Sequence, residues 1–235
     1  MNKFILPKVH LSYSQMQVWK SNPARYRREY FEAGKRLDTK YLQFGKGIAA
    51  LVEELCDIEK TIPGQDKSCV KLQALNILRD RHGLDEGTYD ALWALDTEGT
   101  SEFKIELLIH DVPFLMFIDK MREDLNVFRE YKTGKIAWDK AKVQKHEQLV
   151  VYAVGRRAQT GKMPAYCDLD WLETSEKADE SDDFWAKVDK KLKLTGKVKS
   201  FHREFDEREL DRMEEKIVRV ATEISVAYQA FLAEI

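Results

Sequence analysis

The sequence predicts a mixed α/β (α+β) fold in which a central mixed β-sheet is flanked by helices. Between residues 103 and 131, three short β-prone runs follow one another, with turn-forming residues between them. Segments with apolar residues at helical spacing precede and follow these runs. An order of helix, three strands, helix and strand is typical of a domain whose helices cover a sheet.

The helices before the strands have recognisable starts. Ser12 or Ser14 can cap a first helix, because a hydroxyl side chain accepts a hydrogen bond from a free N–H of the first turn. Pro23 suits the first turn of a second helix, and Gly34 is expected to end it. The segment 44–56 then predicts an amphipathic helix from apolar residues at three- to four-residue spacing, namely Ile48, Leu51, Val52 and Leu55.

A helical insertion is expected between this amphipathic helix and the strands. Ile62-Pro63-Gly64 interrupts the helical pattern, and residues 67–95 then favour two short helices separated by His82-Gly83. We therefore expect one domain over residues 1–235, with a helical insertion at about 62–100. A chain of this length fits one large domain.

The remaining elements follow from the change in periodicity. They are strands at 103–109, 112–118 and 126–131, a helix at 142–160, a strand at 165–172, an acidic loop at 173–183 and a long amphipathic C-terminal helix at 205–231. Gly161 and Pro164 are expected to end the helix that precedes the fourth strand.

The composition indicates a globular protein with a solvated surface. Hydrophobic residues make up 43% and charged residues 34% of the 235 residues, which is enough apolar material for a core. We find neither an apolar run of membrane-spanning length nor a signal-peptide core, so a cytoplasmic location without a membrane partner is expected. Cys56, Cys69 and Cys167 lie far apart, which makes a zinc ribbon or a disulfide scaffold unexpected.

The charge of the chain is uneven along the sequence. The formal net charge of −2 gives no overall attraction to nucleic acid. Lys and Arg concentrate in residues 20–36 and 132–145, whereas acidic residues concentrate in 173–183 and near the C-terminus. This asymmetry permits a basic groove on an acidic body, although cationic runs are more often solvated surface.

The strongest chemical signal comes from Asp119, Glu130 and Lys132. Asp119 ends an apolar strand, and Glu130 and Lys132 share one face of the next strand because side chains alternate along a strand. If the two strands pair, both carboxylates lie together and suit Mg²⁺ or Mn²⁺. Such a metal polarises a scissile phosphate and activates water, and a lysine can position that water and offset the developing charge. The set predicts phosphodiester hydrolysis.

The pattern Glu-x-Lys or Asp-x-Lys is common in a chain of this charge. It also begins at Asp38, Glu102 and Asp189, and an isolated pair of this kind is more often a surface ladder. Glu130 differs because its strand follows an apolar strand that ends in Asp119, and because the predicted helix 142–160 comes after it.

That helix carries Gln148 and Tyr152 on one face, since they stand four residues apart. Side chains of these types on a helix that faces the core usually satisfy local hydrogen bonds. Beside the carboxylates and the lysine, they are interpreted as contacts to phosphate or to metal-bound water.

These motifs together resemble a known family. Ile118-Asp119, Glu130-Tyr131-Lys132-Thr133-Gly134-Lys135 and Gln148-x-x-x-Tyr152 resemble the core of RecB-like nucleases of the PD-(D/E)XK superfamily, which includes the RecB and AddB nuclease domains and CRISPR adaptation nucleases. Leu11-Ser12-Tyr13-Ser14 with Asn22-Pro23-x-x-Tyr26 is similar to the opening S-x-S…C-P-x-x-Y of the family. Phe44-Gly45 and Glu53-Glu54 are similar to the ends of its F-G-x-x-x-H-x-x-x-E helix. The resemblance covers about residues 11–56 and 113–172.

The resemblance implies a restriction-endonuclease-like core and a site with assigned roles. The catalytic residues would be Asp119, Glu130, Lys132, Gln148 and Tyr152. Mg²⁺ or Mn²⁺ would be held by Asp119, Glu130 and the backbone carbonyl of Tyr131, with Glu53 as an extra ligand. Contacts to DNA are expected from Ser14, Arg25, Tyr26 and Lys135.

The sequence departs from the family pattern at three positions. Ala49 stands where the family has a metal-binding histidine, so that ligand is missing, and Glu53 can supply an oxygen ligand instead. Asn22 stands where the iron–sulfur members begin their cluster, and a C-terminal trio of cysteines is missing, so no Fe–S cluster is expected. Met116 replaces the usual glycine, which we interpret as a packing difference.

Three functions are compatible with these observations. The leading hypothesis is a metal-dependent deoxyribonuclease of exonuclease type, with DNA as its partner and a helicase, recombinase or single-strand-binding protein as a further partner. The alternative is a catalytically weak or inactive DNA-binding module of a larger DNA-processing complex, which Ala49 favours and the intact Asp119, Glu130 and Lys132 oppose. A general interaction protein with chance matches is the third.

Aromatic residues and histidines near the motifs receive other interpretations. Tyr131 points to the face opposite Glu130 and is expected to pack in the core. Tyr13 and Trp138 can stack on bases, although most aromatic side chains in such a chain are core. His146 is interpreted as a surface residue.

Overall fold

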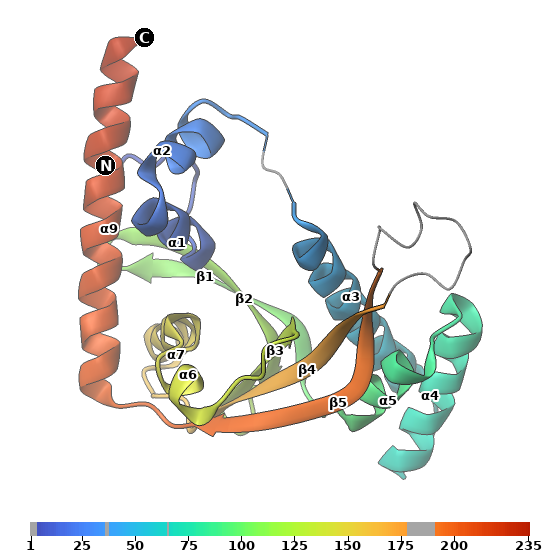
Figure 1. The fold of residues 1–235 in the computed structure, drawn as a ribbon. Helices are drawn as coiled ribbons and strands as arrows, with labels where there is room; N and C mark the ends of the chain where they lie inside the picture. Colours follow the sequence, from blue (N-terminus) through green and yellow to red (C-terminus); the bar gives the residue numbers. More distant parts are fainter. Residues whose placement is uncertain (1–3, 36–37, 65, 178–190) are drawn as a thin grey trace, which may run out of the picture.

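A five-stranded mixed sheet with helices on both faces forms the protein (Figure 1). The structure is a computed structural model that describes residues 4–35, 38–64, 66–177 and 191–235. The strands, in their order across the sheet, are β1 (Thr100–Ile109), β2 (Val112–Arg122), β3 (Val127–Gly134), β4 (Cys167–Lys177) and β5 (Lys191–Arg203). The predicted fold class, with its flanking helices and long C-terminal helix, is confirmed.

The helices lie before, within and after the run of strands. They are α1 (Tyr13–Ser21), α2 (Pro23–Tyr26), the π-helix η1 (Arg27–Phe31), α3 (Lys40–Thr61), α4 (Lys67–His82), α5 (Glu86–Ala94), α6 (Lys140–Gln144), α7 (Glu147–Thr160) and α9 (Glu207–Glu234). Among these helices, none is long and apolar enough to cross a membrane.

The strand connections explain why the sheet is mixed. β1, β2 and β3 form an antiparallel meander, β4 runs parallel to β3, and β5 returns antiparallel to β4. A parallel pair cannot be joined by a tight turn, so the chain crosses the sheet face between β3 and β4. The crossover contains α6 and α7, and it places the start of α7 beside β3.

Two groups of buried side chains divide the apolar interior. One is formed with α1, α7 and α9 and contains Phe114, Phe128 and Leu169. The other is formed with α3, α4 and α5 and contains Leu172 and Leu194. Because residues alternate along a strand, neighbouring positions of β3 and β4 serve opposite faces of the sheet.

The N-terminal segment is tied to the sheet as well as to α9. The backbone N–H of Leu11 donates to the carbonyl of Pro113 at 2.8 Å, and the N–H of Leu115 donates to the carbonyl of Leu11 at 2.9 Å. Leu11 is fully buried. Figure 1 shows α1 and α2 beside the long red helix α9, so both ends of the chain pack around β1 and β2.

The helix predicted at 142–160 is divided in two by Lys145 and His146. The guanidinium of Arg203, which is 1% exposed, donates to the carbonyls of Val143 and His146 at 3.0 Å each. These bonds satisfy carbonyl groups that a continuous helix would have used internally. Helix α6 therefore ends at Gln144, and α7 begins at Glu147 with His146 as its N-cap residue.

The fourth strand is longer than predicted, and it pairs with a fifth strand that was not predicted. β4 continues to Lys177 because β5 pairs with it, with an irregularity in register between Leu172 and Thr174. The loop predicted at 173–183 is therefore wrong for residues 173–177. Residues 178–183 lie outside the described residues.

The helices expected at 67–95 are present as α4 and α5. They pack against α3 and β5, and the contact between α5 and β5 is close. A Cβ atom added at Gly87, in the first turn of α5, would lie 2.2 Å from the carbonyl oxygen of Leu194 on β5. Only a residue without a side chain permits this approach.

We expect Gly87→Ala to lower the free energy of unfolding by about 1–3 kcal/mol, because α5 must move away from β5. Gly47→Ala is the matched control, since a Cβ atom there has no atom within 4 Å among the described residues. In the middle of α3 this change should raise stability by about 0.5–1 kcal/mol. Urea unfolding measures both, and equal losses in the two variants would contradict the close packing of α5.

Candidate active site

The candidate site lies where the sheet divides. The pairing of β2 with β3 ends at Lys120 and Arg129, and in this register Asp119 and Glu130 are the next opposed residues. Beyond this point β2 pairs with β1, whereas β3 continues beside β4. The two carboxylates therefore lie at the base of a fork between β2 and β3.

Side-chain hydrogen bonds replace the missing strand pairing at this fork. Asp119 Oδ2 accepts the backbone N–H of Tyr131 at 2.7 Å. Asp119 also lies near the carboxylate of Glu130. Lys132 Nζ forms an ion pair with Glu130 Oε1 on the same face of β3. The structure therefore brings together Asp119, Glu130 and Lys132.

Helix α7 contributes the next side chains. Gln148 Oε1 accepts a hydrogen bond from Lys132 Nζ at 2.9 Å, and Gln148 Nε2 donates to the Tyr152 hydroxyl at 2.6 Å. Tyr152 packs edge-on against Phe128 of β3, with ring centroids 5.9 Å apart. The four-residue spacing of Gln148 and Tyr152 thus places both beside the lysine.

The electrostatics of the site follow from burial and mutual proximity. Burial, and then the neighbouring Glu130, raises the pKa of Asp119 well above its usual value. Burial alone would lower the pKa of Lys132, but Glu130 and Asp119 outweigh burial and raise it. Burial, followed by the same two carboxylates, also raises the pKa of Tyr152 well above the usual value. Lys132 is therefore a cation and Tyr152 a neutral donor at physiological pH.

Glu130 fits a metal ligand because one of its oxygens is unused. Its side chain is 2% exposed, and Oε2 has no hydrogen-bond partner among the described residues. A buried acceptor without a partner is costly, and a hard cation satisfies it well. Asp119 beside it and the carbonyl of Tyr131 supply further oxygens of the kind that Mg²⁺ and Mn²⁺ prefer.

Among the described residues, a third side chain does not join Asp119 and Glu130 as a metal ligand. Within residues 4–35, 38–64, 66–177 and 191–235, no group of three or more His, Cys, Asp or Glu side chains is arranged to hold a metal. Burial, then Asp119 and Glu53, raises the pKa of Glu102, so each of these two carboxylates lies near enough to Glu102 to affect it. Glu53 thus lies near Glu102, and its role as an extra ligand stays a prediction.

Glu102 was missed as a neighbour of the site. It stands opposite Asp119 in the register of β1 and β2, and its φ of 47° is unusual for a residue with a side chain. The sequence pattern Glu102-x-Lys104 pointed to it only as a chance match. Its position depends on a strained backbone that the sequence does not reveal.

The residues predicted to contact DNA have different environments. Ser14 is exposed at the start of α1, and Lys135 is exposed and paired with Glu176 at 2.7 Å. Arg25 is 42% exposed along its side chain and pairs with Glu29 at 2.6 Å. These three positions leave polar groups accessible to a ligand.

Tyr26 does not fit the predicted contact with DNA. It is fully buried, its ring stacks on Tyr30 at 4.5 Å, and its hydroxyl donates to Gln15 at 3.1 Å. Its side of α2 faces the core, so its ring cannot reach a ligand. Tyr131, in contrast, packs on the face opposite Glu130 beside the α3–α5 cluster.

His146 is only partly exposed, so the interpretation as a surface residue holds in part. Its ring lies between Trp138 and Tyr13, with centroid distances of 4.9 and 6.5 Å, and its Nε2 is buried. The turn between α6 and α7 directs it inward. Tyr13 is half-buried beside it, and burial, followed by Glu147, raises the pKa of Tyr13 to about 12.

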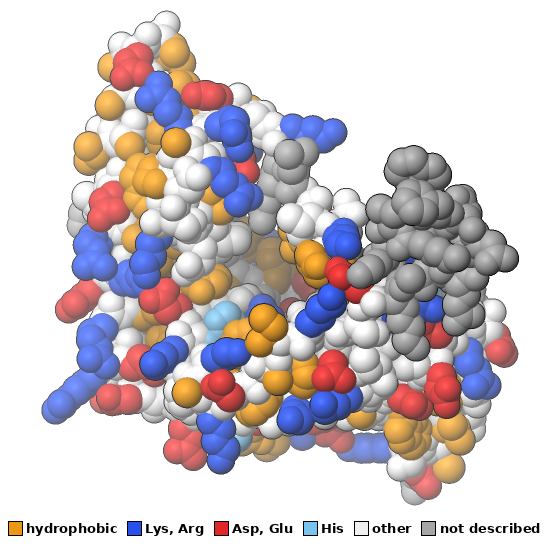
Figure 2. All heavy atoms as spheres, in the orientation of Figure 1, with side chains coloured by type: hydrophobic (Ala, Val, Ile, Leu, Met, Phe, Trp, Pro, Cys, Tyr) orange, Lys and Arg blue, Asp and Glu red, His pale blue; other side chains and the backbone are white. Residues whose placement is uncertain are grey.

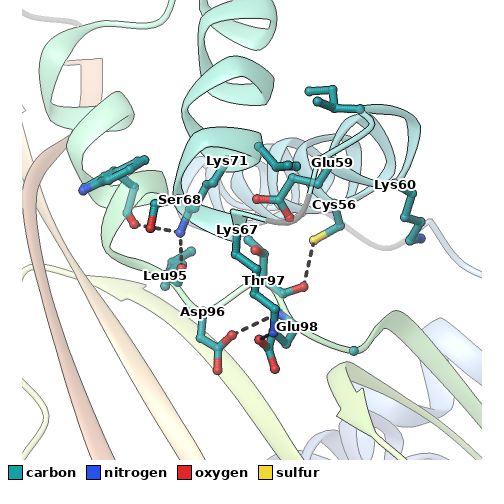
Figure 3. Close-up of a pocket in the computed structure, with 15 residues that line it drawn as sticks. Cys56, Glu59, Lys60, Lys67, Ser68, Lys71, Leu95, Asp96, Thr97 and Glu98 are labelled. Carbon is teal, nitrogen blue, oxygen red and sulfur yellow. Dashed lines mark hydrogen bonds and ion pairs between the residues drawn. The ribbon is translucent and has the colours of Figure 1, made fainter.

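The surface around the site is not uniformly basic. Figure 2 shows Lys and Arg side chains interspersed with acidic ones on this face, which is hollowed between the N-terminal helices and α3. A cavity of about 560 Å³ lies elsewhere, between α3, α4 and the segment 95–99 (Figure 3). Lys67 there pairs with Glu98, and Lys71 donates to the Trp93 carbonyl at 2.7 Å, so these two cations are already engaged.

The raised pKa of Asp119 has a consequence for stability. In the unfolded chain this carboxyl group ionises at its usual, lower pKa, so folding becomes less favourable as pH rises from about 4 through the folded-state pKa. We expect metal-free Asp119→Asn to be more stable than the wild type at neutral pH by about 1–3 kcal/mol, the range for desolvating a buried polar group.

This difference should shrink as the pH falls towards 4, where the carboxyl group is protonated in both states. Urea unfolding of both proteins between pH 4 and about pH 8, with a chelator present, measures it. A constant difference over this range, or a less stable Asp119→Asn at neutral pH, would contradict the assigned environment.

Comparison with known proteins gives low-identity matches in structure alone. No family model matches the chain, and a search of curated proteins gives no match. A candidate exonuclease from Eubacterium rectale is 10% identical over 92% of this chain and 82% of its own, with a TM-score of 0.46. A phage-related exonuclease from Haemophilus somnus 129PT is 12% identical over 86% and 91%, with a TM-score of 0.35. Likenesses of this size decide neither family nor activity, so the function is argued from the site.

Proposed function

We propose that this protein is a deoxyribonuclease that hydrolyses phosphodiester bonds with Mg²⁺ or Mn²⁺, acting on DNA ends as an exonuclease. The observation that carries the proposal is the unused, buried oxygen of Glu130 beside Asp119 and a charged Lys132. A structural ion pair needs neither the second carboxylate nor an unsatisfied oxygen. A site for a divalent cation and a phosphate accounts for both.

The cation would be held by Asp119, Glu130 and the carbonyl of Tyr131, with Glu53 as an extra ligand. When bound, a divalent cation polarises the phosphate and supplies a water of lowered pKa. The Tyr131 N–H already orients Asp119 through its bond to Oδ2, which fixes one carboxylate before a cation arrives.

Lys132 supplies the positive charge that the reaction needs outside the cation. Its raised pKa keeps the ammonium protonated, so it attracts a phosphate oxygen and offsets the charge that grows on it. Gln148 holds the ammonium at 2.9 Å, and Tyr152 holds Gln148 in turn. These two bonds fix the lysine along one direction, which lowers the cost of positioning it in the transition state.

DNA would reach the site over the exposed residues around it. Arg25, Lys135 and Ser14 present donors suited to phosphate oxygens, and Arg25 keeps part of its guanidinium free beyond its bond to Glu29. Because the net charge is −2, the electrostatic attraction of DNA must come from basic residues near the site and not from the protein as a whole.

A DNA-binding module with little or no catalysis is the second candidate. Ala49 favours it, because α3 carries an apolar side chain at the position of the family histidine. The absence of a formed three-carboxylate group among the described residues favours it too. The two candidates differ in one measurable property, which is metal-dependent cleavage.

Metal binding is expected to depend on the carboxylates at the fork. Isothermal titration with Mn²⁺ should show one site in the wild type and a loss of at least about 10-fold in affinity for Asp119→Ala, since one of few anionic ligands is removed. Glu106→Ala, on the exposed part of β1, is the control and should bind like the wild type. Unchanged affinity in Asp119→Ala would refute the assigned ligands.

Cleavage is expected to depend on Lys132. We expect Lys132→Ala to lose roughly 10²- to 10⁴-fold in kcat, the range for one positioned catalytic group, with a smaller change in KM. The alanine variant leaves Glu130 buried without its cation and is expected to be less stable. Lys132→Arg is therefore measured beside it, because it keeps a positive charge next to Glu130 while changing the shape of the donor.

The assay uses labelled linear, circular and single-stranded DNA with Mg²⁺ and with Mn²⁺, and Lys104→Ala serves as the control lysine on β1. Wild-type protein that leaves every DNA form intact with both metals would overturn the nuclease proposal and favour the binding module. Cleavage that persists unchanged in both Lys132 variants would leave the nuclease standing without this role for the lysine.

A further inference from the structure

Three donor side chains converge on the carboxylate of Glu176 near the end of β4. The Tyr41 hydroxyl donates to Glu176 Oε1 at 2.7 Å, and Lys40 Nζ lies 3.3 Å from the same oxygen. Lys135 Nζ donates to Glu176 Oε2 at 2.7 Å. Lys40 and Tyr41 begin α3, whereas Lys135 follows directly after β3. The fold therefore gathers three donors from separate segments around one carboxylate, and we call Lys40, Tyr41 and Lys135 the donor cluster.

The donor cluster is arranged around a negative charge. Hydrogen bonds from Lys135, then from Tyr41 and Lys40, lower the pKa of Glu176 to about 2, so the carboxylate is ionised at physiological pH. The hydrogen bond to Glu176 raises the pKa of Tyr41, so its hydroxyl remains a donor. A carboxylate and a phosphate group both present oxygen acceptors with negative charge to such donors. The cluster is thus suited to a phosphate as well as to Glu176.

The donors are more accessible than the group that they bind. The side chains of Lys40 and Lys135 are 51% and 46% exposed, and Tyr41 is 51% exposed, whereas the Glu176 side chain is 15% exposed. An ammonium group has three N–H donors, and among the described residues neither lysine has a second carboxylate partner. An anion from solvent can therefore reach both lysines. Exposed ion pairs contribute little to stability, so the fold does not require three donors on one carboxylate.

The donor cluster lies beyond the candidate active site along the course of β3. Lys135 comes three residues after Lys132, which separates their Cα atoms by roughly 10 Å at the rise of an extended chain. Helix α3 runs beside the same end of β3, because a Cβ atom added at Gly45 would lie 3.5 Å from Thr133 Oγ1. One DNA strand carries a phosphate about every 3.4 Å along the helix axis, so this separation corresponds to roughly three nucleotides.

We propose that Lys40, Tyr41 and Lys135 bind a backbone phosphate of DNA, and that Glu176 occupies this site until the phosphate displaces it. The inference rests on the proposed function, to which it adds a path for the DNA and a group that limits its binding. A phosphate must replace a carboxylate that three donors already hold. A strand that is bound at the active site presents its next phosphates at high effective concentration, which favours this exchange over binding of a free phosphate ion.

Glu176→Gln tests the competition in the full-length protein, because glutamine keeps the size and an acceptor for Tyr41 but removes the charge. Fluorescence anisotropy with a fluorescein-labelled linear DNA duplex, in the presence of a chelator, measures affinity without cleavage. We expect the affinity to rise roughly 5- to 10-fold at about 0.1 M salt, since log K changes with log salt by about 0.9 for each phosphate contact. The slope of log K against log salt should steepen by the same amount.

Two controls separate a local site from a change in net charge. Glu106→Gln removes the same charge from an exposed carboxylate on β1 that is paired with Lys104, and it should bind DNA like the wild type. In the Glu176→Gln background, Lys135→Ala should remove most of the gain, because a donor of the cluster is missing. Lys104→Ala in the same background removes an equal charge elsewhere and should keep the gain.

The outcomes distinguish this phosphate site from the proposed function. Equal affinities of Glu176→Gln and Glu106→Gln for the duplex, or a gain that survives Lys135→Ala, would overturn the phosphate site and leave the proposed function as it stands. A duplex that binds neither the wild type nor Glu176→Gln would overturn both. A gain specific to Glu176→Gln, in a protein that cleaves no form of DNA, would support the phosphate site and overturn the nuclease alone.

Discussion

The burial of Glu130 is the constraint on which the rest of the site depends. A carboxylate that is 2% exposed must have partners, and strand pairing cannot provide them because β2 and β3 separate at this residue. Lys132 provides one partner from the same strand, and α7 stabilises Lys132 through Gln148. The crossover between β3 and β4 is therefore needed for charge compensation as well as for topology.

Such an arrangement contributes little to stability. A buried ion pair can often be replaced by apolar residues of similar volume at no loss, because desolvation offsets the attraction between the charges. Here the unfavourable electrostatic free energy is increased by a second carboxylate, Asp119, which interacts with Glu130. The opposite face of β3 also carries a charge, since Arg129 bonds to Asp170 at 2.8 Å and to Asp168 at 3.1 Å. Charged residues on both faces of the central strand β3 indicate that its sequence serves the candidate site as well as core packing.

The sequence predicted the parts of the site that depend on local spacing. Glu130 and Lys132 share a face because strand side chains alternate, and Gln148 and Tyr152 share one because they are a helical turn apart. His146 is less exposed than predicted, and its backbone carbonyl, with that of Val143, is bound by Arg203 from far along the chain, a contact that local spacing does not show. Tyr26 was misplaced because a short helix offers no periodicity to show which side meets α9. Strand β5 was missed although residues 191–194 alternate between Lys and Leu, the pattern of a half-buried strand that pairs with β4.

The bonds between Leu11 and β2 also affect how the protein folds. They join residues about a hundred positions apart in sequence, and the arm of β2 that they hold is the one that ends at Asp119. Contacts between such distant residues form slowly in general, because closing a long loop costs conformational entropy before the contacts stabilise the chain. The site thus combines residues of β2 and β3, which are close in sequence, with Gln148 and Tyr152 of the crossover helix. A chain whose crossover has not docked on the sheet carries its carboxylates and its lysine without the side chains that hold the lysine.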